Sequence, residues 1–230
     1  MKIGIIFAME EELIALKKKI EIKNEYTLFN LKFYEACYKN ITCILVESGI
    51  GKVNAARTTQ ILIDNIKVDY IFNIGVAGGI EKSLNVGDII VGTSLVQHDF
   101  DITAFNHEKG YIPKLGVFIN SDKYLIRLTK EIDETLKYGV IASGDIFCTN
   151  PNMSNKIHNK FNALCVEMEG ASIAQVCHLC NVPFLIIRSI SDVPNNNNII
   201  TYDEFLEISS NKVSEIMLKL MEKLSEEKTL

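Results

Sequence analysis

The sequence has no long apolar run, no excess of positive charge and no repeated or low-complexity tract. No window approaches the roughly 18 uninterrupted apolar residues of a membrane-spanning helix. A net charge of −5 argues against a broad surface for the phosphate backbone of nucleic acids. No interdomain linker stands out, and 230 residues fit one large domain. With 47% hydrophobic and 23% charged residues, the chain has the composition of a globular protein.

An export signal is also missing. The first nine residues, from Met1 to Met9, combine a positive charge with an apolar stretch. However, Glu10, Glu11 and Glu12 follow at once, where a signal peptide would carry small residues for cleavage. We therefore expect a soluble protein in the cytoplasm.

The six cysteines each lie inside or beside an apolar run, where free cysteine behaves as a small hydrophobic residue. Cys177 and Cys180 have the spacing of a redox or zinc motif, but no second pair or suitably spaced histidine accompanies them. We expect neither a disulfide framework nor a metal site, and interpret these cysteines as core residues.

Apolar runs alternate with amphipathic stretches along the whole chain. Strands are predicted at residues 2–8, 26–38, 41–47, 69–76, 88–96, 140–143, 163–166 and 183–191. Helices are predicted at residues 10–20, 53–66, 121–137, 170–180 and 202–227, the last capped by Thr201. Buried strands that alternate with helices indicate an α/β sandwich around a mixed sheet. In such folds, active sites gather where strands end and helices begin.

Two glycine-rich junctions resemble nucleotide-binding loops only superficially. Gly51 and Lys52 lack the earlier glycine and the following Ser or Thr of a phosphate-binding loop. The segment from Gly75 to Gly79 does not have the Gly-x-Gly-x-x-Gly pattern of a dinucleotide fold.

A buried charge gives a stronger indication of a site. Arg188 interrupts an otherwise apolar strand, and a buried charge needs a partner. Glu12, Glu169 and Asp192 stand at other junctions and are candidates for a polar pocket shared with it. Carboxylates held together can keep different protonation states, as acid/base catalysis requires. The residues by themselves thus favour a hydrolase or transferase.

At these positions the sequence resembles the bacterial 5′-methylthioadenosine/S-adenosylhomocysteine nucleosidases, within the purine nucleoside phosphorylase-like superfamily. The resemblance extends nearly from end to end. Its anchors are residues 4–12, 48–53, 86–89, 166–169 and 189–192. It implies a single nucleosidase domain over residues 1–230, folded as a three-layer α/β/α sandwich around a mixed, twisted sheet.

The resemblance also implies a chemistry, in which water splits the bond between adenine N9 and ribose C1′. Asp192 matches the acid that protonates adenine N7, and Glu12 matches the base that deprotonates the water. Glu169 matches the residue that holds the ribose hydroxyls. Arg188 matches an arginine that helps to hold the water and supplies compensating positive charge. No metal or cofactor is implied.

The same resemblance assigns substrate contacts. Phe147 is expected to stack on adenine, and the backbone of Cys148 to hydrogen-bond with it. The remaining substrate-binding residues implied for the same pocket are Ala8, Met9, Ile50, Val76, Glu167, Met168 and Ser191. Ile102, Phe105 and Pro113 match residues that cover the 5′-alkylthio pocket of a neighbouring subunit, which implies a homodimer.

One departure and three alternatives remain. Val76 stands where the best-known members carry a serine near the water. A phosphorylase is disfavoured because Asn73 replaces an anion-binding arginine and Glu12 would repel phosphate. A hydrolase for 6-amino-6-deoxyfutalosine shares the adenosine end of the substrate and is not distinguished by sequence. A non-catalytic binding protein is disfavoured because Glu12, Glu169 and Asp192 are all present.

Overall fold

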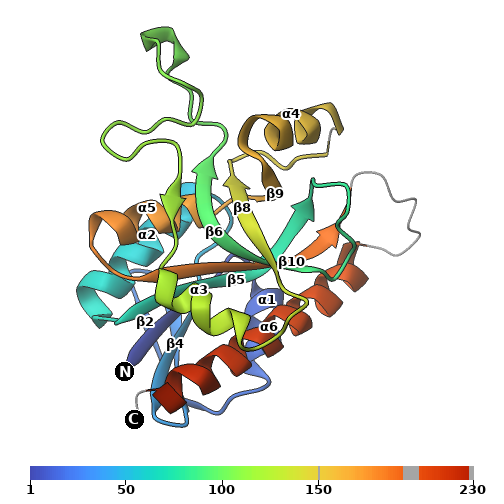
Figure 1. Cartoon of the computed structure of the whole chain (residues 1–230). Helices are drawn as coiled ribbons and strands as arrows, with labels where there is room; N and C mark the ends of the chain where they lie inside the picture. Colours follow the sequence, from blue (N-terminus) through green and yellow to red (C-terminus); the bar gives the residue numbers. More distant parts are fainter. Residues whose placement is uncertain (150, 194–201, 228–230) are drawn as a thin grey trace.

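A computed structural model describes residues 1–149, 151–193 and 202–227 (Figure 1). Its strands are β1 (Lys2–Phe7), β2 (Ile22–Leu28), β3 (Leu31–Tyr38), β4 (Ile41–Glu47), β5 (Tyr70–Gly79), β6 (Ile89–Gln97), β7 (Ile119–Asn120), β8 (Lys137–Ser143), β9 (Ala163–Glu167) and β10 (Phe184–Asp192). Its α-helices are α1 (Glu10–Lys17), α2 (Lys52–Ile61), α3 (Lys123–Lys130), α4 (Pro151–Phe161), α5 (Gly170–Leu179) and α6 (Tyr202–Glu227). A π-helical turn at Leu62–Ile66 extends α2, and a 3-10 turn covers Thr103–Phe105.

The strands form one mixed sheet, as the sequence predicts. Their order is β10-β6-β8-β9-β5-β1-β4-β3-β2, with β7 paired to β6. The strands β4, β1, β5 and β10 are parallel, while β6 runs antiparallel to β10 and β9 antiparallel to β5. Because β10 also pairs with β5, five of these strands close into a ring. The pattern of residues gave no indication of this closure.

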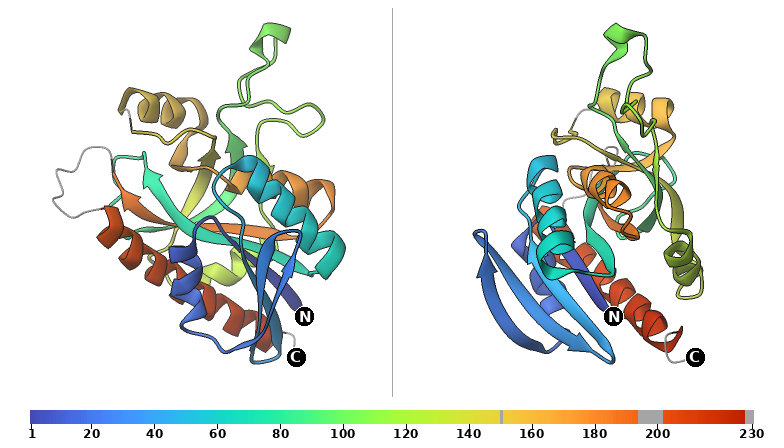
Figure 2. Two further views of the ribbon diagram at one scale, coloured as in Figure 1. Left: turned by 180° about the vertical axis from the view of Figure 1, so that it is seen from behind. Right: turned by 90° about the vertical axis from the view of Figure 1, so that its left-hand side faces the viewer.

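Helices cover both faces of the sheet, which confirms the predicted α/β architecture. Ile3, Ile5 and Phe7 of β1 belong to a core shared with helices α1, α3 and α6. Ile6, between them, belongs to the opposite core, which includes residues of α2 and α5. This alternation is expected of a strand buried on both faces. In Figures 1 and 2, α2 and α5 lie side by side, and the long α6 lies across the other face.

Several predicted boundaries were wrong. The strand predicted over residues 26–38 is a hairpin, because Phe29 and Asn30 have φ angles of 50° and 60° and form its two-residue turn. The helix predicted over 121–137 ends at Lys130, and its last residues belong to a turn and to β8. Helix α4 was not predicted. Thr201, the expected cap of α6, lies outside the described residues.

Only half of the cysteines take the core positions expected of them: three are buried, two are half-buried and one is exposed. All six are free thiols. Cys177 is buried in the core between α5 and the sheet, and Cys180 is half-buried, with its thiol 3.7 Å from Gln60 Oε1. Cys37, in contrast, is exposed on β3.

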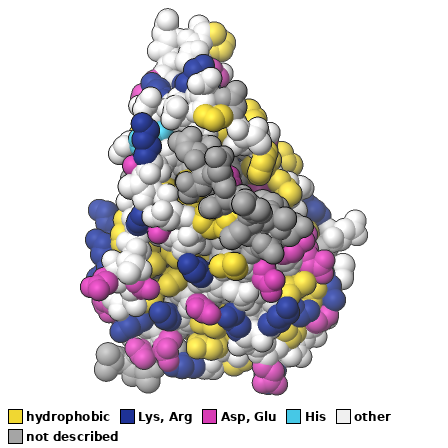
Figure 3. All heavy atoms as spheres, turned by 90° about the vertical axis from the view of Figure 1, so that its right-hand side faces the viewer, with side chains coloured by type: hydrophobic (Ala, Val, Ile, Leu, Met, Phe, Trp, Pro, Cys, Tyr) yellow, Lys and Arg dark blue, Asp and Glu magenta, His cyan; other side chains and the backbone are white. Residues whose placement is uncertain are grey.

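The surface carries charges of both signs. On the face shown in Figure 3, acidic and basic side chains are interspersed and do not form a patch of one sign. Within the part of the chain that the structure describes, no helix combines the length and apolarity of a membrane span.

The core predicts a sharp contrast between two phenylalanines. Phe72 is fully buried in β5, and its replacement by alanine should lower the free energy of unfolding by about 3–5 kcal/mol. Phe29→Ala is the matched control, because this ring is 54% exposed in the hairpin turn. Urea denaturation of both variants measures the difference. Equal losses would show that the core is placed incorrectly.

Candidate active site

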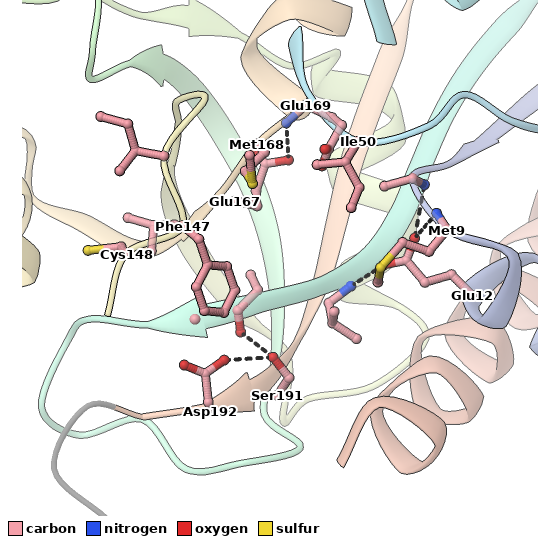
Figure 4. Close-up of a pocket in the computed structure, with 16 residues that line it drawn as sticks. Met9, Glu12, Ile50, Phe147, Cys148, Glu167, Met168, Glu169, Ser191 and Asp192 are labelled. Carbon is pink, nitrogen blue, oxygen red and sulfur yellow. Dashed lines mark hydrogen bonds between the residues drawn. The ribbon is translucent and has the colours of Figure 1, made fainter. Parts of the chain in front are cut away.

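One pocket opens at the edge of the sheet where strands β1, β4, β5, β8, β9 and β10 end (Figure 4). The space between its walls, including the open solvent at its mouth, is about 710 Å³. Its lining combines apolar side chains with a few polar groups, as small-molecule sites do. The lining residues are Ala8, Met9, Glu12, Ile50, Val76, Ala77, Gly78, Ile146, Phe147, Cys148, Val166, Glu167, Met168, Glu169, Ser191 and Asp192. They come from six separate segments of the chain, each at or just beyond the end of a strand.

Glu12 is held against the sheet by backbone groups. It lies in the first turn of α1, and its Oε2 accepts hydrogen bonds from the N–H groups of Ala8 (2.9 Å) and Met9 (3.3 Å). Its Oε1 accepts one from Val76 N–H at 2.9 Å. A Cβ at position 75 would lie 2.4 Å from Oε1, so this approach requires glycine at Gly75. Burial raises the pKa of Glu12, while Arg188 and the three N–H groups oppose the rise.

Glu169 lies at the start of α5 and faces the turn before α2. Its Oε1 accepts a hydrogen bond from Gly51 N–H at 2.8 Å. The side chain is 6% exposed, and its Oε2 lies 3.8 Å from Arg188 Nη2. Burial, together with the neighbouring carboxylate of Glu167, raises the pKa of Glu169 to about 7. Near neutral pH both the protonated and the ionised form of this group are therefore populated.

Arg188 has a different main partner from those expected. Its Nη2 donates to Glu167 Oε2 and to Asn73 Oδ1, and all three side chains are buried. Glu167 Oε2 also accepts from the N–H groups of Glu169 (3.1 Å) and Gly170 (2.7 Å), and Oε1 accepts from Ser143 Oγ. Glu167 thus fixes both the arginine and the start of α5.

Asp192 lies on the opposite side of the pocket from Glu12 (Figure 4). Ser191 Oγ donates to Asp192 Oδ1 at 2.8 Å, with Ala77 O 3.3 Å from the same hydroxyl. Among the ion pairs of the described residues, those of Arg188 are with Glu167 and Glu169 and not with Asp192. The Phe147 ring projects over this side of the pocket, near Asp192.

Most of the predicted site residues line this pocket. Glu12, Glu169, Asp192 and all nine substrate contacts predicted within one subunit do so: Ala8, Met9, Ile50, Val76, Phe147, Cys148, Glu167, Met168 and Ser191. Arg188 does not line the pocket but lies behind it, beside Glu167 and Glu169.

Ile102, Phe105 and Pro113 are also not part of the lining. They lie in the arm between β6 and β7, which projects from the body of the molecule in Figure 1. The expectation for these three concerned a neighbouring subunit, so it remains a prediction.

Sequence reasoning missed several groups. Ala77 and Gly78 lie within the glycine-rich turn that had drawn attention, and Ile146 and Val166 adjoin predicted contacts. Asn73 and Ser143, which hold Arg188 and Glu167, are polar residues inside buried strands. A polar residue within an apolar strand is also the feature by which the sequence indicated Arg188. The backbone N–H of Gly51 carries no sequence signal.

Comparisons with known proteins agree with this geometry. The chain matches the Phosphorylase superfamily over residues 2–222. The 5′-methylthioadenosine/S-adenosylhomocysteine nucleosidase of Bacillus subtilis is 39% identical over 230 residues, covering 97% of this chain and 100% of the relative. The chain belongs to this nucleosidase family.

Solved structures of nucleosidases share the fold. The Helicobacter pylori 5′-methylthioadenosine/S-adenosyl homocysteine nucleosidase, in complex with a pyrrolopyrimidine compound, superimposes with a TM-score of 0.92 at 38% identity. The match covers 96% of this chain and 97% of that one. A structure described as native futalosine hydrolase of Helicobacter pylori also has a TM-score of 0.92, at 37% identity and with the same coverage. The predicted nucleoside phosphorylase/hydrolase fold is thereby confirmed.

The raised pKa of Glu169 predicts how pH affects the stability of this nucleosidase. A carboxyl whose pKa is higher in the folded state stabilises the fold below its unfolded pKa, and this stabilisation is lost as pH rises through the folded value. The window runs from 4.5 to about 7, which corresponds to at most about 3 kcal/mol. Glu169→Gln should remove this dependence. Denaturant titrations at pH 5 and 8 measure it, and an unchanged pH dependence in the variant would contradict the assignment.

Proposed function

We propose that the protein hydrolyses the N-glycosidic bond of 5′-methylthioadenosine and S-adenosylhomocysteine, and of 5′-deoxyadenosine, to release adenine. Its place would be methionine salvage and the recycling of S-adenosylmethionine by-products. The observation that carries the proposal is that Glu12, Glu169 and Asp192 line one pocket with Phe147, in a chain of the nucleosidase family. The pocket thus contains side chains that could bind a purine, such as Phe147 and Asp192, and one that could bind ribose hydroxyls, Glu169.

Asp192 is the proposed acid. Departure of adenine leaves an electron pair on the purine, and a proton delivered to N7 neutralises it. The Ser191 hydroxyl, which donates to Asp192 Oδ1, fixes the carboxyl orientation and leaves Oδ2 for the purine. Phe147, on the same side of the pocket, offers its ring for stacking on adenine. The backbone of Cys148 is the proposed hydrogen-bond partner of the base.

Glu12 is the proposed base. The water adds its oxygen to C1′ of the oxocarbenium-like sugar and gives its proton to Glu12. A carboxylate has about four acceptor positions, and three are used by backbone N–H groups. One position therefore remains for the water. Burial, which raises the pKa of Glu12, makes the carboxylate a stronger base.

Glu169 is the proposed ribose-binding residue, and Arg188 the source of compensating charge. Gly51 N–H occupies Glu169 Oε1, which leaves Oε2 to accept from the ribose hydroxyls. The positive charge of Arg188 favours the ionised form of both Glu12 and Glu169. We assign Arg188 this electrostatic role alone, because it lies behind the pocket lining and its Nη2 is bonded to Glu167 and Asn73. Met9, Ile50 and Met168 provide the apolar surface for the sugar and the alkylthio group.

Hydrolysis is favoured over phosphorolysis by the charges of the pocket. Among the described residues that line the pocket, four are acidic and none is a lysine or an arginine. The four acidic residues are Glu12, Glu167, Glu169 and Asp192. Phosphate would require cationic or strongly donating groups. Asn73, at the position of an anion-binding arginine in phosphorylases, is directed to Ile6 O and Arg188 and not to the pocket.

A second candidate substrate is 6-amino-6-deoxyfutalosine. The similarity to a Helicobacter pylori structure described as futalosine hydrolase supports it. Both substrates present the same adenosine end to Asp192 and Phe147. Catalytic efficiencies measured side by side for the two substrates and for S-adenosylhomocysteine decide which one the pocket prefers.

We further propose that the protein acts as a cytoplasmic homodimer. The six free thiols suit a reducing compartment. Phe105 is 76% exposed on the projecting arm. Ile50, in the turn before α2, is 52% exposed, and Val53, in the first turn of α2, is 79% exposed. These apolar side chains suit a contact between subunits in which Ile102, Phe105 and Pro113 complete the partner's alkylthio pocket.

Removal of either proposed catalytic carboxylate should nearly abolish adenine release. Asp192→Asn and Glu12→Gln should each lower kcat by about 100- to 10,000-fold, because proton transfer to N7 or from water is lost. Adenine release in phosphate-free buffer, followed by absorbance, measures this. Glu131→Gln, an exposed residue of an ion pair remote from the pocket, is the control. Wild-type turnover in either variant, or strict dependence on phosphate, would refute the proposal.

The arm should matter for both assembly and substrate. Phe105→Asp should weaken the dimer and raise KM for 5′-methylthioadenosine about 10-fold, because a charge would replace apolar cover of the alkylthio group. Sedimentation velocity and initial rates measure the two effects. Phe29→Asp, exposed in the β2–β3 hairpin, is the control. A wild-type protein that sediments as a monomer, or an unchanged KM, would overturn the dimer proposal.

A further inference from the structure

The turn from Gly49 to Lys52 resembles a phosphate-binding loop without being one, and the structure shows what it binds instead. Gly51 N–H donates to Glu169 Oε1 and Lys52 N–H donates to Asp145 Oδ1, both at 2.8 Å. Two amides at the start of α2 thus each hold a carboxylate of this chain. The two carboxylates come from different segments of the chain, since Glu169 caps the start of α5 and Asp145 precedes the pocket residues Ile146 and Phe147.

The Lys52 side chain adds a second connection between the same segments. Its Nζ lies 2.7 Å from Asp99 Oδ1 and 3.1 Å from Gln97 Oε1, at the end of β6. The side chains of Lys52 and Asp99 are 18% and 19% exposed, so solvent screens this pair less than a fully exposed one. Asp99 Oδ2 accepts from Asp145 N–H at 3.0 Å. Lys52, Asp99 and Asp145 therefore form a closed ring of interactions, which we name the loop clamp.

The loop clamp holds the segment that carries the proposed adenine contact. Residues 144–148 have no regular secondary structure, and Ile146 and Phe147 are 47% and 64% exposed. Gly144 N–H, bonded to Glu167 O at 3.1 Å, fixes the beginning of the segment. Beyond it, both the N–H and the carboxylate of Asp145 are engaged by the clamp. The position of the Phe147 ring thus depends on groups that do not touch the pocket.

We propose that Lys52 is a positioning residue, which through Asp99 and Asp145 holds the Phe147 loop against the ribose-binding turn. The inference rests on the proposed function in one respect, that Phe147 binds the purine. Without the clamp, the loop samples other positions, and binding of the base must order it again. The cost falls on binding of the purine. The carboxylates that carry out proton transfer keep their own backbone contacts.

Lys52→Met and Asp99→Asn test this with shapes close to the natural ones. We expect KM for 5′-methylthioadenosine to rise at least about 10-fold, equivalent to about 1.4 kcal/mol, with kcat within about 3-fold of wild type. The inhibition constant of adenine should rise by a similar factor. That of 5-methylthioribose, which lacks the base, should not change. KM of the double variant should exceed that of either single variant by no more than about 2-fold, because both substitutions break the same ring of interactions.

A control and a direct reporter separate positioning from general destabilisation. Lys39→Met breaks the exposed Lys39–Glu222 ion pair and should leave all these constants unchanged. Because the chain has no tryptophan, Phe147→Trp introduces a single tryptophan into the loop, which can be excited selectively at wavelengths where the eight tyrosines absorb little. Its emission should be quenched by saturating adenine, and its anisotropy without ligand should fall when Lys52→Met is added.

The inference is overturned if folded Lys52→Met or Asp99→Asn keeps wild-type constants for substrate and adenine. It is also overturned if adenine and 5-methylthioribose weaken equally, since this would indicate a general loss of structure. Failure of the proposed function is a distinct result, in which the wild-type protein releases no adenine.

Discussion

The site depends on one positive charge buried in the middle of a sheet. Arg188 lies on β10 with three carboxylates around it, two within 4 Å and that of Glu12 close enough to be affected by its charge. Removal of such a cation from a buried cluster would leave uncompensated negative charge, which is far more costly than the ion pair is stabilising. Asn73, Ser143 and the start of α5 are arranged around this pair. Its charge favours the ionised forms of the two carboxylates proposed for the base and for the ribose, against the burial that raises the pKa of both.

The fold was largely predictable, because the alternation of buried strands with helices is a local pattern. β1, β4 and α6 were recognised in this way, with ends close to those observed. One wrong boundary was set by the local backbone conformation, which the hydrophobic pattern does not show. The turn at Phe29 and Asn30 lacks the glycine that normally marks a two-residue hairpin. Closure of the sheet between β10 and β5 could not be predicted, since strand order is set by long-range packing.

The site was predictable where a residue conflicted with its surroundings or matched a family motif. Arg188 attracted notice as a charge in an apolar strand. Its partner Glu167 was predicted only as a substrate contact, because the two lie on strands that are not neighbours in the sheet. Gly75 illustrates the same limit. Its lack of a side chain admits Glu12, a relation between helix and strand that a linear pattern does not contain.

The place of β10 in the sheet has a consequence for synthesis of the protein. This strand, residues 184–192, pairs with both β5 and β6 although it comes late in the chain. Until the ribosome has released it, β5 and β6 each lack a neighbour and present unpaired backbone edges. The emerging chain therefore carries two open edges that can associate with other chains. A chain that ends before β10 also lacks Ser191 and Asp192, and with them one side of the pocket.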